Sequence, residues 1–450
     1  MLSVHAARRR WLVGLVAVAL LVMPLGPVGQ ARAADASLVV AALHVLEDEY
    51  VDPVHPVPLL NAAITTIRKV STLGAGALPD IPSDATPEAA ESAFTSEFAR
   101  AAQAGPLPET RLAYVATEGM LASLNDTHTN FLDPKAYVES RQQIMGRPGF
   151  TGIGVVITSR KDPSGDSWIF IEDVFPGSPA DGGGLKRFDR IVEVDGKSLK
   201  NANSVDASQL IRGPAGSTAV LTIRRGDQIL NMSVIRAPIK EPPVEAKFIQ
   251  PGVLYVKLFG FTQGSGRQLR SVLEGLAAQE SVRSVILDLR GNLGGLVHEA
   301  VAVGGLFLPP RTVLAKIQER GQPASTLRTT SYPLLPRTPV ILLTDNLSAS
   351  ASEIIIGAFK DYHRANIVGE KTAGALGGSV TVTLPEGTGM SVTVERILTP
   401  NGSVVEGVGI TPDTEVSLTV ADMERGDDTQ LQAALRAVGA VRPSRQAAAA

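Results

Sequence analysis

Val340-Ile-Leu-Leu-Thr-Asp-Asn-Leu-Ser-Ala-Ser-Ala-Ser-Glu353 decides the fold class of this chain. Its first five residues form a short apolar run, which predicts a buried strand over 340–344. A polar turn follows, and the residues from about 350 to 361 predict a helix. A buried strand that leads through a turn into a helix is typical of an α/β domain, whose sites lie beyond the carboxyl ends of the strands.

The same succession of strand and helix recurs on both sides of this stretch. Upstream, apolar strands are predicted over 253–258 and 285–289, followed by helices over 266–279 and from about residue 297. Downstream, Ile367 and Val368 indicate a further short strand. We therefore expect one α/β core over residues 239–420.

Two segments of different character precede this core. Residues 34–145 are rich in alanine, with apolar residues at helical spacing over 37–67 and 87–124, and they predict a helical N-terminal subdomain. Residues 146–238 contain short apolar strands separated by glycine-rich turns, and they predict a compact β-rich module. Three prolines within 238–243 indicate the linker by which the chain leaves this module.

The two ends of the chain differ from the folded modules. Three arginines, an apolar run from Trp11 to Met23 and the site Ala31-Arg32-Ala33 have the order of a secretory signal peptide, so we expect residues 1–33 to be removed on export. The protein would then work in the periplasm, in the cell envelope or outside the cell. Without cleavage, the segment would attach the chain to a membrane. Residues 421–450 are polar and then alanine-rich, and they predict a loose C-terminal tail.

Composition argues against several classes of function. The 450 residues carry a net charge of -3, which does not favour binding to nucleic acid. Without cysteine, the chain can form neither disulfides nor a thiolate metal site nor a cysteine nucleophile. The six histidines are scattered, and no pair has a metal-ligand spacing such as His-Glu-x-x-His. We therefore expect no metal and no organic cofactor.

Ser350 is the first candidate for chemistry. It lies between a buried strand and a helix N-terminus, where the helix dipole favours negative charge on its oxygen. The alternative is that Ser348 or Ser350 only caps the helix.

Two other polar segments carry candidate residues. Gly294 and Gly295 follow the strand that ends at Leu289, and adjacent glycines can turn their N–H groups toward an oxyanion, although they can equally form a plain turn. In the same segment, Asp288 and Arg290 are typical of a structural ion pair. His128 lies in a polar turn after the N-terminal helices, where it is either a catalyst or a structural residue.

Taken together, these segments resemble the C-terminal processing (tail-specific) peptidases, a family with a PDZ domain inserted into an α/β serine-peptidase core. The resemblance extends from about Val45 to Pro412, with the family's motifs in their order. The matching motifs are Tyr50-Val-Asp-Pro53, Leu124 to Leu132, Asp288 to Gly295, Ser348 to Glu353, Gly369-Glu370 and Glu406-Gly-Val-Gly-Ile-Thr-Pro-Asp413. The resemblance implies a ClpP/crotonase-like core, with Ser350 as nucleophile and the N–H groups of Gly295 and Ala351 as the oxyanion hole.

The family's usual general base is missing. In the family, a lysine in Gly-Glu-x-Thr-Phe-Gly-Lys-Gly is followed four residues later by a glutamine. This chain has Ala375 and Ser379 at those positions, or Gly377 and Thr381 if two residues are inserted. Lys371 is out of register in the same segment and stays open as an alternative base.

The related tricorn branch implies a different base. There, a histidine from the region before the PDZ domain serves the serine, supported by a neighbouring hydroxyl and a distant glutamate. The matching residues are His128, Thr127 and Glu406. A neutral imidazole can take the serine proton and pass it to the leaving amine, while a carboxylate stabilises the resulting charge. Alternatively, the His128 segment only closes the helical subdomain and Glu406 only caps a turn.

The resemblance predicts an exported serine endopeptidase that cleaves proteins or peptides with accessible C-terminal or unstructured segments. The alternative is a catalytically inactive PDZ scaffold that binds protein tails. Gly152, Ile153 and Gly154 match the loop with which PDZ domains hold a C-terminal carboxylate on backbone N–H groups. Phe188 stands where the family usually has a glycine, which leaves the conformation of that turn open. The module could also act only as a lid or activator over the serine.

Overall fold

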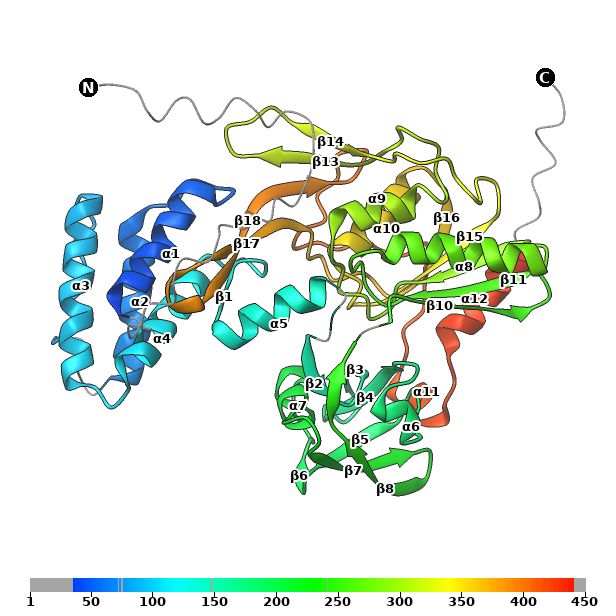
Figure 1. The fold of residues 1–450 in the computed structure, drawn as a ribbon, viewed down its shortest axis with the longest axis horizontal. Coiled ribbons are helices and arrows are strands. Elements are labelled where there is room, and N and C mark those ends of the chain that lie inside the picture. The colour runs from blue at the N-terminus through cyan, green and yellow to red at the C-terminus, as the bar shows by residue number, and fades with distance from the viewer. Residues whose placement is uncertain are drawn as a thin grey trace.

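The computed structural model describes residues 35–440 except 72, 74, 75, 146, 148 and 241. The signal peptide expected over 1–33 lies outside the described residues. Along the described chain, a helical subdomain, a β-rich module and an α/β core follow one another (Figure 1). Within the described residues, we find no helix with the length and apolar character needed to cross a membrane.

The helical subdomain contains four helices where two long helical stretches were expected. They are α1 (Ala36–Glu49), α2 (Pro56–Val70), α3 (Pro87–Ala104) and α4 (Glu109–Ala122). Each expected stretch is divided near prolines, at Pro53 and at Pro106, because the residue before a proline is disfavoured in a helix. The side chains of Leu60, Phe94 and Phe98 are almost fully buried between these helices.

The β-rich module is an antiparallel sheet with two short helices. Its sheet has the order β3-β4-β5-β7-β8, with β6 paired to β5. The elements are β3 (Val155–Lys161), β4 (Ser167–Val174), α6 (Pro179–Gly182), β5 (Arg190–Val194), β6 (Lys197–Ser198), α7 (Ser204–Ile211), β7 (Thr218–Arg225) and β8 (Gln228–Ile235). Strands β2 (Phe150–Gly152) and β9 (Ala237–Ile239) pair with each other, so the chain enters and leaves the module at one place.

The α/β core is built on a six-stranded sheet of order β10-β11-β12-β15-β16-β19. Its strands are β10 (Val244–Gln250), β11 (Val253–Leu258), β12 (Ser284–Asp288), β15 (Val340–Thr344), β16 (Ala365–Gly369) and β19 (Thr414–Glu415). All neighbours are parallel except β10 and β11. Because Asp288 on β12 is opposite Leu343 on β15, the loops after these two strands begin side by side.

Both faces of this sheet are covered. Leu287 and Leu342 point to a cluster shared with α8 (Ser265–Gln279), α9 (Val297–Gly304) and α10 (Ala351–Asp361). Their neighbours Ile286 and Ile341 point to the opposite face, as expected from the two-residue period of a strand. The continuous apolar runs that predicted buried strands therefore reflect burial on both faces.

The C-terminal segment differs from the loose tail expected over 421–450. Its described part forms two helices, α11 (Val420–Arg425) and α12 (Thr429–Ala440), which come directly after β19 along the chain. Ala433 and Ala434 of α12 are buried against the second face of the large sheet. Alanine-rich sequence can pack closely on a sheet because its side chains are small, so low hydrophobicity did not reveal this helix.

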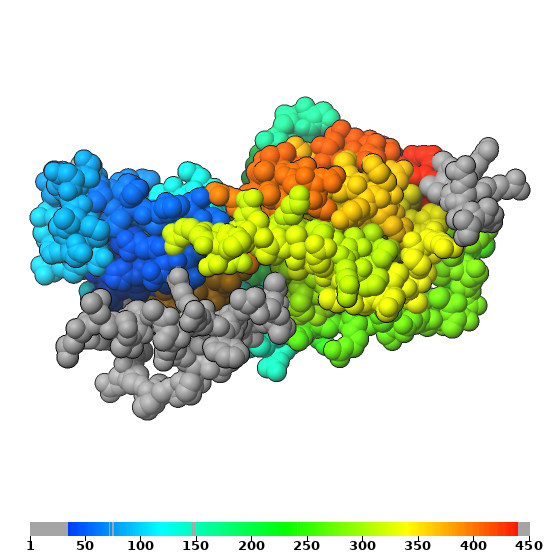
Figure 2. Space-filling model, turned by 90° about the horizontal axis from the view of Figure 1, so that it is seen from above, coloured from blue at the N-terminus to red at the C-terminus, as the bar shows by residue number. Residues whose placement is uncertain are grey.

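A second sheet joins the core to the helical subdomain. It has the order β1-β18-β13-β14, with β17 paired to β18. Its strands are β1 (Asn130–Leu132), β13 (Val313–Glu319), β14 (Ser325–Arg328), β17 (Gly377–Thr383) and β18 (Gly389–Leu398), with α5 (Pro134–Ile144) and the short helix η1 (Pro385–Gly387) beside them. The β13–β14 hairpin reaches α1 (Figure 2), where Arg320 donates to the backbone oxygens of Glu47, at 2.7 Å, and Asp48, at 2.5 Å.

Phe188 adopts a backbone conformation that usually requires glycine. Its φ is +71°, which costs a non-glycine residue about 1–2 kcal/mol. The ring is buried in a cluster with Phe170 of β4 and with Leu418 and Met423 of the C-terminal segment. Burial of the ring offsets the backbone strain, and the C-terminal segment is thereby packed onto the β-rich module.

Candidate active site

Ser350 lies at the start of α10, directly after the turn that follows β15. Its φ of +54° is strained for a serine, and the side chain remains half-buried. Two hydrogen bonds hold its N–H, to the carbonyl oxygen of Ala375 at 2.9 Å and to Oε2 of Glu353 at 3.1 Å. Ser350 is therefore the N-cap of α10, and it is held in a sharp turn beyond the carboxyl end of β15.

The two neighbouring serines are buried structural residues. Ser348 Oγ donates to the carbonyl oxygen of Leu289 at 2.9 Å, and Ser352 Oγ donates to that of Asn292 at 3.0 Å. Both side chains are inaccessible to solvent. Of the serines at positions 348, 350 and 352, only Ser350 is thus accessible to a ligand.

Gly294 and Gly295 pack directly against the serine turn. Their φ values of +97° and +136° lie in the region that favours glycine. A Cβ on Gly294 would lie 2.6 Å from Ser350 Cβ, and a Cβ on Gly295 would lie 2.6 Å from the carbonyl oxygen of Phe261. Among the described residues, the N–H groups of Gly295 and Ala351 have no hydrogen-bond acceptor; Gly295 is exposed, whereas Ala351 is fully buried.

His128 is held in the turn after α4 by Asp126. The Asp126 carboxylate accepts the His128 N–H at 2.9 Å and the hydroxyls of Thr129, at 2.7 Å, and Thr393, at 2.6 Å. Burial alone would raise the pKa of Asp126, but these hydrogen bonds lower it below its usual value, so the carboxylate stays ionised. The turn is consequently fixed to β18, the strand that carries Thr393.

The imidazole of His128 meets Glu406, 278 residues further along the chain. Nε2 of His128 lies 3.3 Å from Oε2 of Glu406 and 3.1 Å from the backbone nitrogen of Gly377. A Cβ on Gly377 would lie 2.7 Å from the ring, so glycine makes room for the imidazole. Burial of the ring lowers the pKa of His128, but the Glu406 carboxylate, with smaller effects from Asp126 and Glu353, raises it above the usual 6.5.

Residues 375–377 bring Ser350, Glu406 and His128 together. The carbonyl oxygen of Ala375 accepts the Ser350 N–H, the Leu376 N–H donates to Glu406 at 2.5 Å, and the Gly377 N–H donates to His128 at 3.1 Å. In the described structure, no hydrogen bond joins the Ser350 hydroxyl to His128. Residues 375–377 therefore contact the backbone of Ser350 and the side chains of Glu406 and His128.

Glu353 is a buried residue of this site that sequence reasoning named only as the end of a motif. Its carboxylate accepts four hydrogen bonds, from the Thr372 hydroxyl and from the N–H groups of Gly374, Ala375 and Ser350. Burial nevertheless raises its pKa. A glutamate three residues after a helix N-cap is a capping signal, which could have indicated this role.

Lys371, the alternative base, is not brought into the site. Its side chain is exposed, and it has no ion pair or hydrogen bond with any described residue. Lys257 is buried instead, with Nζ 2.7 Å from Asp173 of the β-rich module and within 2.5 Å of the Arg290 carbonyl oxygen. Its charge is paired with the carboxylates of Asp173 and Asp288. Burial alone would lower the pKa of Lys257, but these carboxylates raise it.

Asp288 and Arg290 form the structural ion pair expected from the sequence. Arg290 Nη2 lies 2.6 Å from Asp288, Nη1 lies 2.8 Å from Asp428, and both Asp288 and Arg290 are fully buried. The nearby Arg290 holds the pKa of Asp288 far below its usual range although burial acts in the opposite direction. This pair fixes the start of the loop that leads to Gly294.

Gly152, Ile153 and Gly154 line one small cavity in the β-rich module. The cavity of about 50 Å³ lies between β3 and α7, and its other lining residues are Phe150, Val155, Ile157, Ser208, Ile211 and Arg212. Within the described residues, the N–H groups of Ile153 and Gly154 donate to no acceptor. N–H groups without an acceptor are one requirement of a loop that holds a terminal carboxylate.

Comparison with known proteins identifies the family of the core and the type of the inserted domain. Residues 252–416 match the sequence pattern of Peptidase family S41, and residues 142–224 match that of the PDZ domain. The chain is 33% identical over 338 residues to the carboxyl-terminal-processing protease of Picosynechococcus sp., covering 73% of this chain and 80% of that protein. It is 30% identical over 320 residues to the chloroplastic carboxyl-terminal-processing peptidase 2 of Arabidopsis thaliana, covering 68% of this chain and 61% of that protein.

The fold of the chain is also similar to that of a solved C-terminal processing protease. The solved structure of the photosystem II D1 C-terminal processing protease superposes with a TM-score of 0.55 at 24% identity, covering 86% of this chain and 94% of that chain. The family and the fold class expected from the sequence are thus confirmed. This chain belongs to peptidase family S41, the C-terminal processing serine proteases with a PDZ domain.

Proposed function

We propose that this protein is an exported serine endopeptidase in which Ser350 is the nucleophile and His128, supported by Glu406, is the general base. The observation that carries the proposal is the contact of residues 375–377 with the Ser350 backbone, Glu406 and His128. Export is part of the proposal because residues 1–33 have the order of a signal peptide.

The proposed reaction follows the chemistry of acyl transfer. Ser350 Oγ attacks the peptide carbonyl while His128 takes its proton, and the carbonyl oxygen becomes an oxyanion held by the N–H groups of Gly295 and Ala351. His128 then gives the proton to the leaving amine, and water hydrolyses the acyl-enzyme. Nε2 contacts Gly377 and Glu406 in this structure, so the imidazole must turn when substrate binds, to present one ring nitrogen to Ser350 Oγ and keep the other beside Glu406.

We propose that the PDZ domain selects substrates by their C-terminus. The carboxylate would bind the N–H groups of Ile153 and Gly154, and the preceding residues would extend as a strand beside β3. Since the cavity holds only about 50 Å³, the terminal side chain should be small and apolar. Substrates would therefore be proteins or peptides with an accessible end of this kind.

Covalent labelling tests the proposal directly. A fluorophosphonate probe should label wild-type protein at Ser350, identified by mass spectrometry of the labelled peptide. His128→Ala should lose the labelling because Ser350 then has no base, whereas Lys371→Ala should retain it. Unlabelled wild-type protein would support a catalytically inactive PDZ scaffold instead, and labelling that depends on Lys371 would replace His128 as the base.

The pH dependence of cleavage should report on Glu406. His128 acts as a base only when neutral, so kcat/KM should rise with pH through the raised pKa of His128. Glu406→Gln removes the main charge that raises this pKa, and the acidic limb of the profile should move to lower pH. The control Glu415→Gln, on an exposed residue of β19, should leave the limb in place. An unmoved limb in Glu406→Gln would contradict the assigned pair.

The raised pKa of His128 also makes the stability of the folded protein depend on pH. Because the folded-state pKa of His128 is raised, its protonation stabilises the folded protein fully below the unfolded value, and this contribution is lost as pH rises through the folded pKa. The neutral form that catalysis requires is therefore the form in which the His128 turn is held less strongly.

Gly294→Ala should lower kcat by about 100-fold, because a new Cβ at 2.6 Å from Ser350 Cβ must displace the nucleophile. The matched control is Gly264→Ala, where φ is also strongly positive, at +87°, but a Cβ would meet no atom within 4 Å. This variant incurs only the backbone cost of about 1–2 kcal/mol and should keep kcat. Equal kcat in the two variants would mean that the Gly294 contact does not position Ser350.

A further inference from the structure

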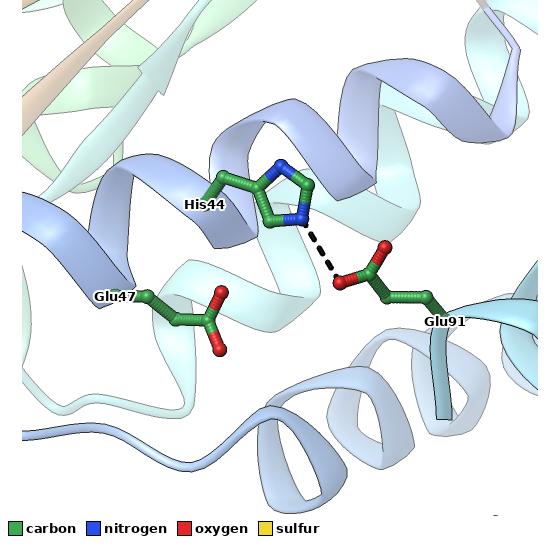
Figure 3. A group of neighbouring side chains, drawn as sticks. All are labelled: His44, Glu47 and Glu91. Atoms are coloured by element: carbon green, nitrogen blue, oxygen red, sulfur yellow. Dashed lines mark hydrogen bonds and ion pairs between the residues drawn. The ribbon is translucent and has the colours of Figure 1, made fainter. Parts of the chain in front are cut away.

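Three potential metal ligands meet on the surface of the helical subdomain, outside the active site. His44 and Glu47 lie three residues apart on one face of α1, and Glu91 faces them from α3 (Figure 3). Nε2 of His44 is 2.9 Å from Oε1 of Glu91, and one ligand atom from each of the three residues lies within 4.8 Å of the others. Small rotations of these side chains would bring all three atoms to a single ion.

The backbones that carry these ligands are fixed by packing. Leu43 and Leu46 of α1 are fully buried, and so is Phe94 of α3, so the two helices cannot shift freely. Arg320 from the β13–β14 hairpin donates to the carbonyl oxygen of Glu47 at 2.7 Å and thereby holds this end of α1. Ligands on rigid elements lose little entropy when an ion binds.

The surroundings favour a cation. A cavity of about 560 Å³ beside Glu91 is lined by small, apolar and acidic residues; among the described residues that line it none is basic, and the acidic ones are Asp35, Glu88, Glu91 and Glu109. Such a groove raises the local concentration of cations. A bound cation would remove the repulsion between Glu47 and Glu91.

We propose that His44, Glu47 and Glu91 form a Zn²⁺ site that joins α3 to α1. One imidazole nitrogen and two carboxylate oxygens are a ligand set that Zn²⁺ accepts, with water at the fourth position of a tetrahedron. Ca²⁺ and Mg²⁺ fit less well, because they prefer six or more oxygen ligands or a nearly complete water shell. The site uses a single histidine, which is why a search for paired histidines in the sequence does not find it.

Calorimetric titration tests the site. Full-length protein without a histidine tag is treated with EDTA, dialysed and titrated with ZnCl2, and one Zn²⁺ should bind per chain. His44→Ala and Glu47→Gln should each weaken binding by at least about tenfold. In protein loaded with Co²⁺, the visible absorption of a four-coordinate ion should appear in the wild type and disappear in His44→Ala, while circular dichroism reports that the helices are intact.

Two matched control variants distinguish coordination of Zn²⁺ by the three ligands from nonspecific attraction of cations to the acidic groove. His55→Ala removes an exposed histidine at the start of α2, and Glu88→Gln removes a charge from the same groove without removing a ligand, so both should keep one bound Zn²⁺. The proposal is overturned if wild-type protein binds no Zn²⁺, if His44→Ala binds it unchanged, or if Glu88→Gln weakens binding as much as Glu47→Gln. The last outcome would mean that the acidic groove attracts cations without a defined site.

Discussion

Ser350→Ala should lower kcat for peptide cleavage by about 10⁴–10⁶-fold, and His128→Ala should have an effect of similar size. Nucleophile and base act as one unit, because a serine hydroxyl that keeps its proton is a poor nucleophile and a base without a nucleophile has no proton to take. The double variant should therefore be no slower than Ser350→Ala alone. The measurement is kcat/KM for a fluorogenic unstructured peptide that ends in a small apolar residue with a free carboxylate.

Lys371→Ala is the matched control for this series, since it removes a cation from the same loop. The Lys371 side chain is exposed and makes no ion pair with the described residues, so its loss should leave kcat unchanged. Additive losses for Ser350 and His128 would show that the two residues act separately. Inactivation by Lys371→Ala, with activity kept in His128→Ala, would restore a lysine mechanism for this chain.

Arg290→Met should lower the free energy of unfolding of the core by about 3–5 kcal/mol. Arg290 is fully buried, and its guanidinium is shared between Asp288, at 2.6 Å, and Asp428, at 2.8 Å. Removing the cation takes the nearest cationic partner from both carboxylates, so the fully buried Asp288 keeps only Lys257, at 3.6 Å, and Asp428 keeps only Arg187, at 3.9 Å. The buried Asp288 then has to be protonated or the segment around Asp428 has to separate from the core, and either costs free energy.

Urea unfolding followed by intrinsic fluorescence would measure this loss. The control is Arg396→Met, which breaks an ion pair with Asp52 in which both side chains are about half exposed. Exposed pairs contribute about 0–1 kcal/mol, so this variant should unfold at nearly the wild-type urea concentration. Equal destabilisation by the two substitutions would contradict the role of burial in the Arg290 pair.

Local patterns predicted the elements around the nucleophile well. The apolar runs over 285–289 and 340–344 became β12 and β15, and Ser350 lies at the expected junction of strand and helix. These features depend on neighbouring residues, which a sequence displays directly. The ion pair of Asp288 and Arg290 belongs to the same class, since the two residues are only two positions apart.

Features that depend on distant residues were harder to predict. The meeting of His128 and Glu406 joins positions 278 residues apart, and only the resemblance to a known family suggested it. The contacts of residues 375–377 depend on backbone groups, which every residue possesses, so no side chain marked that segment in the sequence. Helix α12 was missed because its packing on the sheet relies on the small size of Ala433 and Ala434.

The cluster around Phe188 sets the boundaries of the piece that could be exchanged between related proteins. Phe188 packs with Leu418, Val420 and Met423, so the inserted domain has part of its apolar surface covered by a segment that follows the core. A graft of residues 146–238 alone would leave these side chains facing a foreign surface or water, which favours aggregation. The recombinable unit is therefore discontinuous, and it consists of the inserted domain together with α11 and the residues just before it.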